Sequence, residues 1–266
     1  MSEEQLDIIK EFTVSIALEA GSAIKNLQES DLVEIDYKGT SNNLVTTADL
    51  AADKIIVSAI KAKFPPHKIL SEESSSDTNN LASGDLWVID PIDGTTNFSY
   101  GSPFTAVSIA YLKDGVAQVG VVYAPFSDEL FVGVIGKGST LNGNRIKTRT
   151  TTNVSEALIA TGFPYERDNI AEIGDRLTRL LEKCRDIRRF GASSLDICWV
   201  ACGRLDAYYE DVKPWDMAAG ALIAKESGAS VSSYKENAES LPPSLHATGF
   251  VTACTESLCN ELLNVL

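Results

Sequence analysis

The segment from Trp87 to Phe98, WVIDPIDGTTNF, constrains the fold of this chain more than any other stretch. A strand-like run over residues 86–89 leads into its two acids. Pro91 fixes its own φ and biases Asp90 towards an extended conformation, so Asp90 and Asp93 are predicted to meet at a strand end and not along a helix. Convergent carboxylate oxygens with little nitrogen or sulfur are the ligands that Mg²⁺ prefers.

The Gly94-Thr95-Thr96 step that follows offers backbone N–H groups and hydroxyls suited to phosphate oxygens. Taken alone, however, a DxxDG pattern is explained equally well by a strand that ends in an ordinary Asp/Gly turn. Other parts of the chain must decide between these two interpretations.

Three further segments place acids at comparable boundaries. LSEES closes a strand-like run with Glu72 and Glu73, KPWDMAAG puts Asp216 at the start of a helical pattern of small residues, and NLVTTAD ends at Asp49. Four acidic positions at the ends of elements favour a shared site over four unrelated turns.

With these segments in place, the chain resembles the inositol monophosphatase family of Mg²⁺-dependent, lithium-sensitive phosphatases. The signatures of that family are DPIDGTTNF, WD-x-AAG and an upstream pair of glutamates, and the resemblance covers nearly all 266 residues. It implies an α/β (α+β) fold of the layered αβαβα sugar-phosphatase type. It also implies one domain over residues 1–266, with two tightly packed halves at about 1–150 and 151–266 and the site where they meet.

The resemblance implies a set of metal ligands in this sequence. The first Mg²⁺ would take Glu72, Asp90 and the Ile92 carbonyl, and the second would take Asp90, Asp93 and Asp216. A third, more weakly bound Mg²⁺ would also contact Glu72, which gives two to three ions per site. Asp90 is suited to bridging two ions because one carboxylate has two oxygens.

The resemblance also implies catalytic and substrate-binding roles. Thr95 would help Glu72 orient the attacking water, and Gly94 and Thr95 would donate backbone N–H groups to the phosphate. Further contacts with the substrate are implied for Asp93, Gly191, Ala192, Ser193, Glu210 and Asp216.

Two departures from the family pattern affect these roles. The family usually carries Glu-x-Gly before the WD motif, with a longer spacing to the Asp. Here Glu210 precedes Asp216 without that Gly, so either Glu210 or Asp211 takes the hydroxyl-binding place. Asn43 stands where many relatives have Asp, which weakens the additional cation site.

Each of several candidates also has a purely structural interpretation. Asp216 could be the N-cap of the helix that follows, and Asp49 could be a cap although the family places an acid here close to the metals. Lys38 could be a solvated loop lysine, whereas the family's lysine in this loop lies near the metals. Gly191–Ser193 could be an ordinary helix start.

The bulk composition excludes several classes of protein. Asp and Glu total 37 against 23 Lys and Arg, a net charge of −14, which argues against a nucleic-acid-binding protein. Bound divalent cations would reverse this repulsive field for a phosphate substrate. The sequence contains no run of 18 apolar residues, so no membrane span is expected. The 5 cysteines form no CxxC, which predicts a reduced cytoplasmic protein, and the 2 histidines make a zinc enzyme unlikely.

The resemblance thus implies a phosphomonoesterase that acts on inositol monophosphate or a related polyol phosphate, a small molecule, and that forms a homodimer. Fructose-1,6-bisphosphatase and histidinol-phosphatase activities are the alternatives on the same fold. A regulatory, protein-binding role is the alternative from another class.

Hydrophobic periodicity predicts the elements around these motifs. Helices are expected at residues 3–28, 49–63 with Asp49 as N-cap, 170–184, 193–203, 216–227 and 255–265. Strands are expected within 104–124, 130–135 and 247–253, with tight turns at Asp114-Gly115 and Asn142-Gly143 and polar loops at 38–43 and 74–84.

Overall fold

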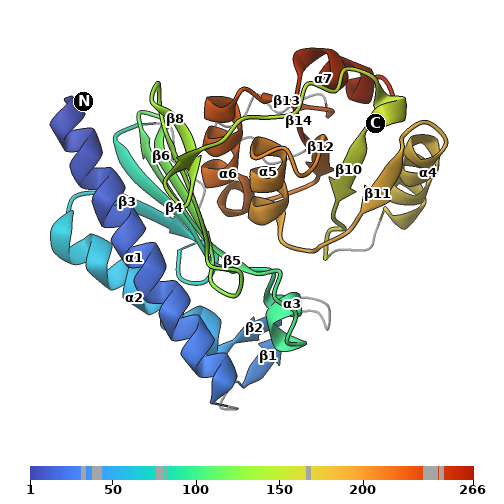
Figure 1. Ribbon diagram of the computed structural model, residues 1–266. Helices are drawn as coiled ribbons and strands as arrows, with labels where there is room; N and C mark the ends of the chain where they lie inside the picture. The colour runs from blue at the N-terminus through green and yellow to red at the C-terminus, as the bar shows by residue number, and fades with distance from the viewer. Residues whose placement is uncertain are drawn as a thin grey trace.

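The computed structural model describes residues 1–30, 34–37, 44–75, 81, 83–165, 169–235, 245 and 249–266. It is a mixed α/β structure in which two sheets alternate with three helical layers (Figure 1). None of the described helices is both long and apolar enough to cross a lipid bilayer.

The first outer layer consists of α1 (Glu3–Glu29) and α2 (Thr47–Lys63), which cover one face of a seven-stranded sheet. The sheet has the order β3-β4-β5-β6-β7-β8-β9, and only the β3–β4 pair is parallel. Its strands are β3 (Lys68–Ser71), β4 (Asp85–Asp93), β5 (Ala106–Lys113), β6 (Val116–Ala124), β7 (Glu129–Val134), β8 (Gly138–Leu141) and β9 (Asn144–Arg145).

The middle layer holds α5 (Ser193–Ala201) and α6 (Pro214–Ser227), whose buried side chains join both sheets in one core cluster. The second sheet has the order β11-β10-β12-β14-β13, and α4 (Ile170–Leu181) and α7 (Glu256–Leu263) lie on its far side. Its strands are β10 (Leu158–Thr161), β11 (Asp186–Arg188), β12 (Ala207–Glu210), β13 (Ser230–Ser233) and β14 (Phe250–Ala253).

Four short elements complete the described chain: β1 (Ile35–Tyr37), β2 (Leu44–Thr46), α3 (Thr95–Ser99) and the 3₁₀ turn η1 (Val154–Glu156). The strands of one sheet end at Arg145 and those of the other begin at Leu158. Helix α6 follows β12 of the second sheet, but it also packs against the first sheet. The predicted division of the chain into two halves therefore stays a prediction.

The expected α1, α2, α4, α5, α6 and α7 helices are present, and both tight turns are confirmed by positive φ values at Asp114, Gly115, Asn142 and Gly143. The strands β10 to β13 were not predicted, because they are short and lack a clear alternation. The polar loop at 38–43 and most of the loop at 74–84 lie outside the described residues, and so do Lys38 and Asn43.

The predicted N-cap at Asp49 is wrong, and the alternative interpretation of Asp216 as an N-cap fails in the same way. Helix α2 begins at Thr47 with Thr46 as N-cap, and Asp49 accepts a hydrogen bond from the Thr46 N–H at 2.7 Å. Helix α6 begins at Pro214, and Asp216 accepts from the Lys213 N–H at 2.7 Å. In both helices the acid therefore occupies the third helical position and reaches back to the cap.

Candidate metal and substrate site

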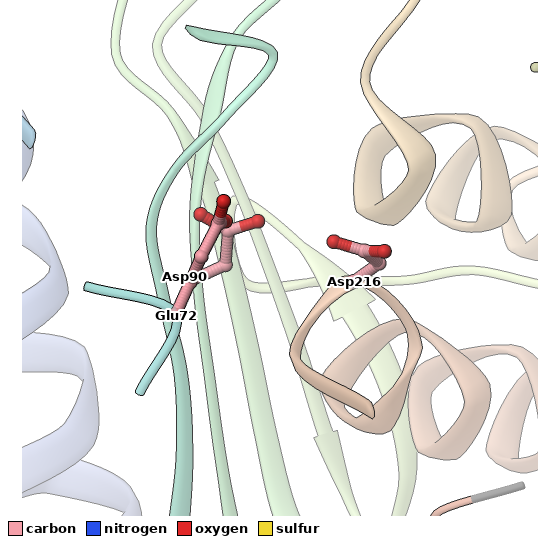
Figure 2. Close-up of side chains that lie close together, drawn as sticks. All are labelled: Glu72, Asp90 and Asp216. Atoms are coloured by element: carbon pink, nitrogen blue, oxygen red, sulfur yellow. The ribbon is translucent and has the colours of Figure 1, made fainter. Parts of the chain in front are cut away.

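Glu72, Asp90 and Asp216 come together at one point of the fold. β3 and β4 run parallel, so Glu72, which follows β3, lies beside Asp90 on β4. Asp216 faces them from the first turn of α6 (Figure 2). One carboxylate oxygen from each residue lies within 4.8 Å of the others, and among the described residues this is the acidic group that could hold a metal ion.

The electrostatics of this group favour a cation. Burial raises the pKa of Asp90 well above its ordinary value, and the charges of Glu72 and Asp93 raise it further. Burial likewise raises the pKa of Asp216, with Asp93 and Glu72 adding to the effect. Within the described part of the chain, no Lys or Arg forms an ion pair with Asp90 or Asp216. A set of carboxylate oxygens alone suits a hard divalent cation such as Mg²⁺.

The turn after β4 fixes the next group of candidates. Gly94 has φ +92°, and a Cβ there would lie 2.8 Å from the Phe104 carbonyl oxygen, so only glycine fits. The Thr95 hydroxyl donates to Asp49 Oδ1 at 3.0 Å and to the Ile92 carbonyl at 3.1 Å. Asp49, predicted as a weak candidate, is thus buried and in direct contact with Thr95.

Asp93 takes a position that its motif did not suggest. Its carboxylate accepts from the Ser193 N–H at 3.1 Å, the Ser194 N–H at 2.6 Å and the Ser194 hydroxyl at 2.6 Å, so it caps α5. Burial raises the pKa of Asp93 to about 6, against the lowering effect of the hydrogen bonds from Ser194. Asp93 lines the cavity, but it is not part of the 4.8 Å group, and its role as a metal ligand stays a prediction.

Glu210 and Asp211 differ clearly in their surroundings. Glu210 Oε2 accepts from the Tyr208 hydroxyl at 2.5 Å and from the Ser193 hydroxyl at 3.3 Å, and burial raises the pKa of Glu210 to about 7. Its carboxylate packs so closely on Gly162 that a Cβ there would overlap it. Asp211 instead accepts from Lys235 Nζ at 2.7 Å and from the Gly249 N–H at 2.8 Å.

A cavity of about 450 Å³ connects these residues. We call one part of its lining the carboxylate wall, made of Glu72, Asp90, Asp93 and Asp216. The outer wall consists of Glu172, Arg176, Arg189, Asp211, Lys213 and Lys235. Ile92, Gly94, Thr95, Gly191, Ser193 and Glu210 also line the cavity, whereas Ala192 is buried and is not part of the lining.

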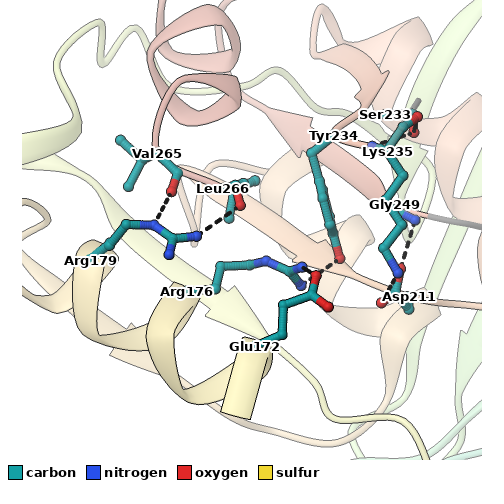
Figure 3. Close-up of polar contacts among 10 residues, drawn as sticks. All are labelled: Glu172, Arg176, Arg179, Asp211, Ser233, Tyr234, Lys235, Gly249, Val265 and Leu266. Atoms are coloured by element: carbon teal, nitrogen blue, oxygen red, sulfur yellow. Dashed lines mark hydrogen bonds and ion pairs between the residues drawn. The ribbon is translucent and has the colours of Figure 1, made fainter. Parts of the chain in front are cut away.

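No motif singled out the basic residues of the outer wall. Arg176 is only 6% exposed, donates to Glu172 at 2.7 Å and to the Tyr234 hydroxyl at 3.2 Å, and is drawn in Figure 3 beside the Lys235–Asp211 pair. The one available signal was the i, i+4 spacing of Glu172 and Arg176 on an expected helix.

Comparisons with known proteins agree over most of the chain. A sequence model of the inositol monophosphatase family matches residues 5–264. Nus factor SuhB of Escherichia coli strain K12 is 41% identical over 224 residues, 83% of each chain. Inositol-1-monophosphatase of Synechocystis sp. is 39% identical over 270 residues, which cover 100% of this chain and 91% of that protein. The crystal structure of extragenic suppressor protein SuhB from Bartonella henselae has a TM-score of 0.86 at 31% identity and covers 97% of this chain and 98% of that one.

Proposed function

The chain belongs to the inositol monophosphatase family, and on that premise we propose that it is a Mg²⁺-dependent phosphomonoesterase for inositol monophosphate or a related polyol phosphate. Family membership supports a metal-dependent phosphatase. The observation that carries the proposal is the convergence of Glu72, Asp90 and Asp216 within 4.8 Å on one wall of a cavity.

In this proposal Glu72, Asp90 and Asp216 hold the cations, together with the Ile92 carbonyl and Asp93. The hydrogen bonds that Asp93 receives from α5 leave a carboxylate with further lone pairs, so a helix cap and a metal ligand are compatible. Bound cations would supply Lewis-acid stabilisation of the charge that develops on the phosphate. Two to three Mg²⁺ per site and inhibition by lithium are part of the same proposal.

The protein's own groups then orient the reactants. Thr95, held by Asp49, and Glu72 would position the attacking water, and the N–H groups of Gly94 and Thr95 would bind phosphate oxygens. Glu210 would accept hydrogen bonds from substrate hydroxyls. Its place beside Ser193 supports this assignment over Asp211, whose carboxylate is already bound to Lys235 and Gly249.

A phosphate-release panel tests the proposal directly. Purified protein would be given inositol monophosphate, fructose 1,6-bisphosphate, histidinol phosphate and an aryl phosphate, each with Mg²⁺, with excess chelator, and with added LiCl. We expect Mg²⁺-dependent release that is fastest with inositol monophosphate and is inhibited by lithium. Activity that persists unchanged in chelator would contradict the metal requirement, and insensitivity to LiCl would contradict the lithium proposal alone.

The basic residues of the outer wall favour keeping fructose 1,6-bisphosphate as an alternative substrate. The outer wall carries Arg176, Arg189, Lys213 and Lys235 in a chain whose net charge is −14. A second anionic group on the substrate would be attracted to this wall. Faster release from fructose 1,6-bisphosphate than from inositol monophosphate would therefore replace the substrate assignment without changing the reaction.

A regulatory, protein-binding role is the second candidate function, and the identity to a relative named Nus factor SuhB favours it. Protein that binds Mg²⁺ but releases no phosphate from any substrate in the panel would support that role over catalysis. A homodimer, implied by the family resemblance, and a cytoplasmic location, predicted from the 5 cysteines that form no CxxC, belong to the proposal as well. Light scattering would test the first.

A further inference from the structure

A buried pair joins α2 to the end of β3, and none of the roles proposed above uses it. The Ser71 hydroxyl donates to Asp53 Oδ1 at 2.5 Å. Ser71 is 0% exposed and Asp53 is 7% exposed. A hydroxyl or a carboxylate buried without a partner is costly, so each group depends on the other. Ser71 is the last residue of β3, and Glu72 follows it directly.

The alternation of side chains along β3 explains why this pair matters for Glu72. Ile69 packs with the α1–α2 side of the sheet, and Leu70 packs with the α5–α6 side. Ser71 again faces α2, so the next side chain, Glu72, points towards α6 and Asp216, as Figure 2 shows.

The backbone at this point is held from the other directions too. The Glu72 N–H donates to the Ile89 carbonyl at 3.2 Å, which ties it to β4 one residue before Asp90. Ser71 and Ser75 exchange backbone hydrogen bonds of 2.8 and 3.2 Å. The Asp53–Ser71 bond adds a side-chain contact that holds this strand end against a helix.

Helix α2 carries a second carboxylate with a similar task. Asp49 lies one turn before Asp53 and holds the Thr95 hydroxyl at 3.0 Å. The helix is itself anchored, because Ala52, Ile56 and Ile60 on it are fully buried. One rigid helix edge therefore reaches both Thr95 and the strand end that carries Glu72.

We propose that Asp53 is a positioning residue which, through Ser71, holds Glu72 in the geometry that the cation requires. The inference rests on the proposed function, since it assigns Glu72 to the metal. Residues that orient metal ligands typically contribute 10–100-fold to metal affinity or activity. A displacement of the Glu72 backbone by a fraction of an ångström would be enough to weaken the site.

The test compares Asp53→Asn, Ser71→Ala and the double variant with wild-type protein. Mg²⁺ binding is measured by calorimetry without substrate, and the Mg²⁺ concentration for half-maximal phosphate release is measured separately. We expect each single variant to weaken Mg²⁺ binding about 10-fold. The double variant should be no weaker than either single one, because the two residues act as a unit. KM for the substrate at saturating Mg²⁺ should stay unchanged. Ser71→Thr, which keeps the hydroxyl that Ser71→Ala removes, should bind Mg²⁺ about as well as the wild-type protein.

Thr151→Ala is the matched control. Thr151 donates to Asp206 at 2.7 Å, and Asp206 is 3% exposed, so this is another hydroxyl bound to a buried acid, with the hydroxyl residue half-buried, and it is not part of the cavity lining. We expect Thr151→Ala to lower thermal stability without changing Mg²⁺ binding.

Two results would overturn the assignment of Asp53. One is a change in Mg²⁺ affinity no larger than that of Thr151→Ala, and the other is a double variant whose loss equals the product of the two single losses. Wild-type protein that binds Mg²⁺ but releases no phosphate would contradict the proposed function alone, because the calorimetric comparison among variants still decides the role of Asp53.

Discussion

The carboxylate wall and the outer wall line the same cavity but balance their charges in opposite ways. On the carboxylate wall, Glu72, Asp90 and Asp216 bring like charges within 4.8 Å, and burial and mutual repulsion raise the pKa of both aspartates. On the outer wall, Arg176 is paired with Glu172 and Lys235 with Asp211.

This difference separates two tasks. A wall of like charges is stable only when something from outside completes it, and a divalent cation does so for carboxylates. On the outer wall the pairs Arg176–Glu172 and Lys235–Asp211 are complete by themselves, and the exposed charges of this wall can be exchanged at small cost in stability. Arg189 forms no ion pair within the described residues and stays available to a ligand. On the proposed function, we therefore expect the reaction to depend on the first wall and the choice of leaving group to depend on the second.

The largest effect should come from Asp90→Asn. Removing one charged oxygen from the residue proposed to bridge two cations should weaken both sites, with a loss of about 4 kcal/mol, or about 10³-fold, in kcat/KM for every substrate. Glu73→Gln, which changes an acid next to Glu72 but outside the 4.8 Å group, is the matched control and should be nearly silent. Full turnover by folded Asp90→Asn protein would end the bridging assignment.

Without Mg²⁺, the carboxylate wall should lower the free energy of unfolding as the pH rises. This is the opposite of ordinary acid denaturation, in which stability is lost as the pH falls. Burial raises the folded-state pKa of Asp90 and Asp216, and that of Asp93 to about 6, from the ordinary aspartate value of 3.8. The folded protein then binds more protons than the unfolded chain between these values. This contribution to stability is present below about pH 3.8 and is lost as the pH rises through 6 and beyond.

Mg²⁺ should replace the lost protons. At about 100 times its Kd, a ligand adds about 2.7 kcal/mol, which corresponds to about 5–10 °C in Tm for a chain of this size. The difference in Tm with and without Mg²⁺ should therefore grow between pH 5 and pH 8. An equal difference at both pH values would show that the carboxylate wall is not under like-charge strain.

The two walls also differ in how much of them could be predicted from sequence. Glu72 directly follows β3, and Asp90 lies in the neighbouring parallel strand β4 just before its irregularity, so the expected strand boundaries brought attention to both. Asp216 was found through its motif, although its helix begins earlier than expected. The cap that Asp93 forms on Ser194 joins residues 101 apart, and no local pattern encodes such a contact.

The outer wall could not be derived in this way. Arg176 and Tyr234 are 58 residues apart, and they meet because α4 packs against the sheet that contains β13. Asp53 is an intermediate case, because its i, i+4 spacing from Asp49 was visible on an expected helix while its partner Ser71 was not. Local sequence patterns thus point to the proposed ligands, and only tertiary packing reveals the residues that support or surround them.

Glu210→Gln should produce an intermediate effect and sharpen the boundary between the walls. If Glu210 accepts hydrogen bonds from substrate hydroxyls, its loss should lower kcat/KM for inositol monophosphate about 10-fold and leave an aryl phosphate nearly unchanged. Asp211→Asn is the matched control, since Asp211 is bound to Lys235, and it should not discriminate between the two substrates. An equal loss on both substrates for Glu210→Gln would make Glu210 a support for the metal site.

The smallest effect is expected for Arg189→Gln on the outer wall. Arg189 is exposed, lines the cavity and forms no ion pair within the described residues. An exposed charge contributes at most about 1 kcal/mol, so kcat/KM for fructose 1,6-bisphosphate should fall about threefold relative to inositol monophosphate, and less at high salt. Arg188→Gln is the matched control, because Arg188 is paired with Asp186 and is not part of the cavity lining. If both variants lowered kcat/KM for both substrates alike, the outer wall would not bind a second anionic group. The separation between reaction and leaving-group choice would then rest on Glu210 alone.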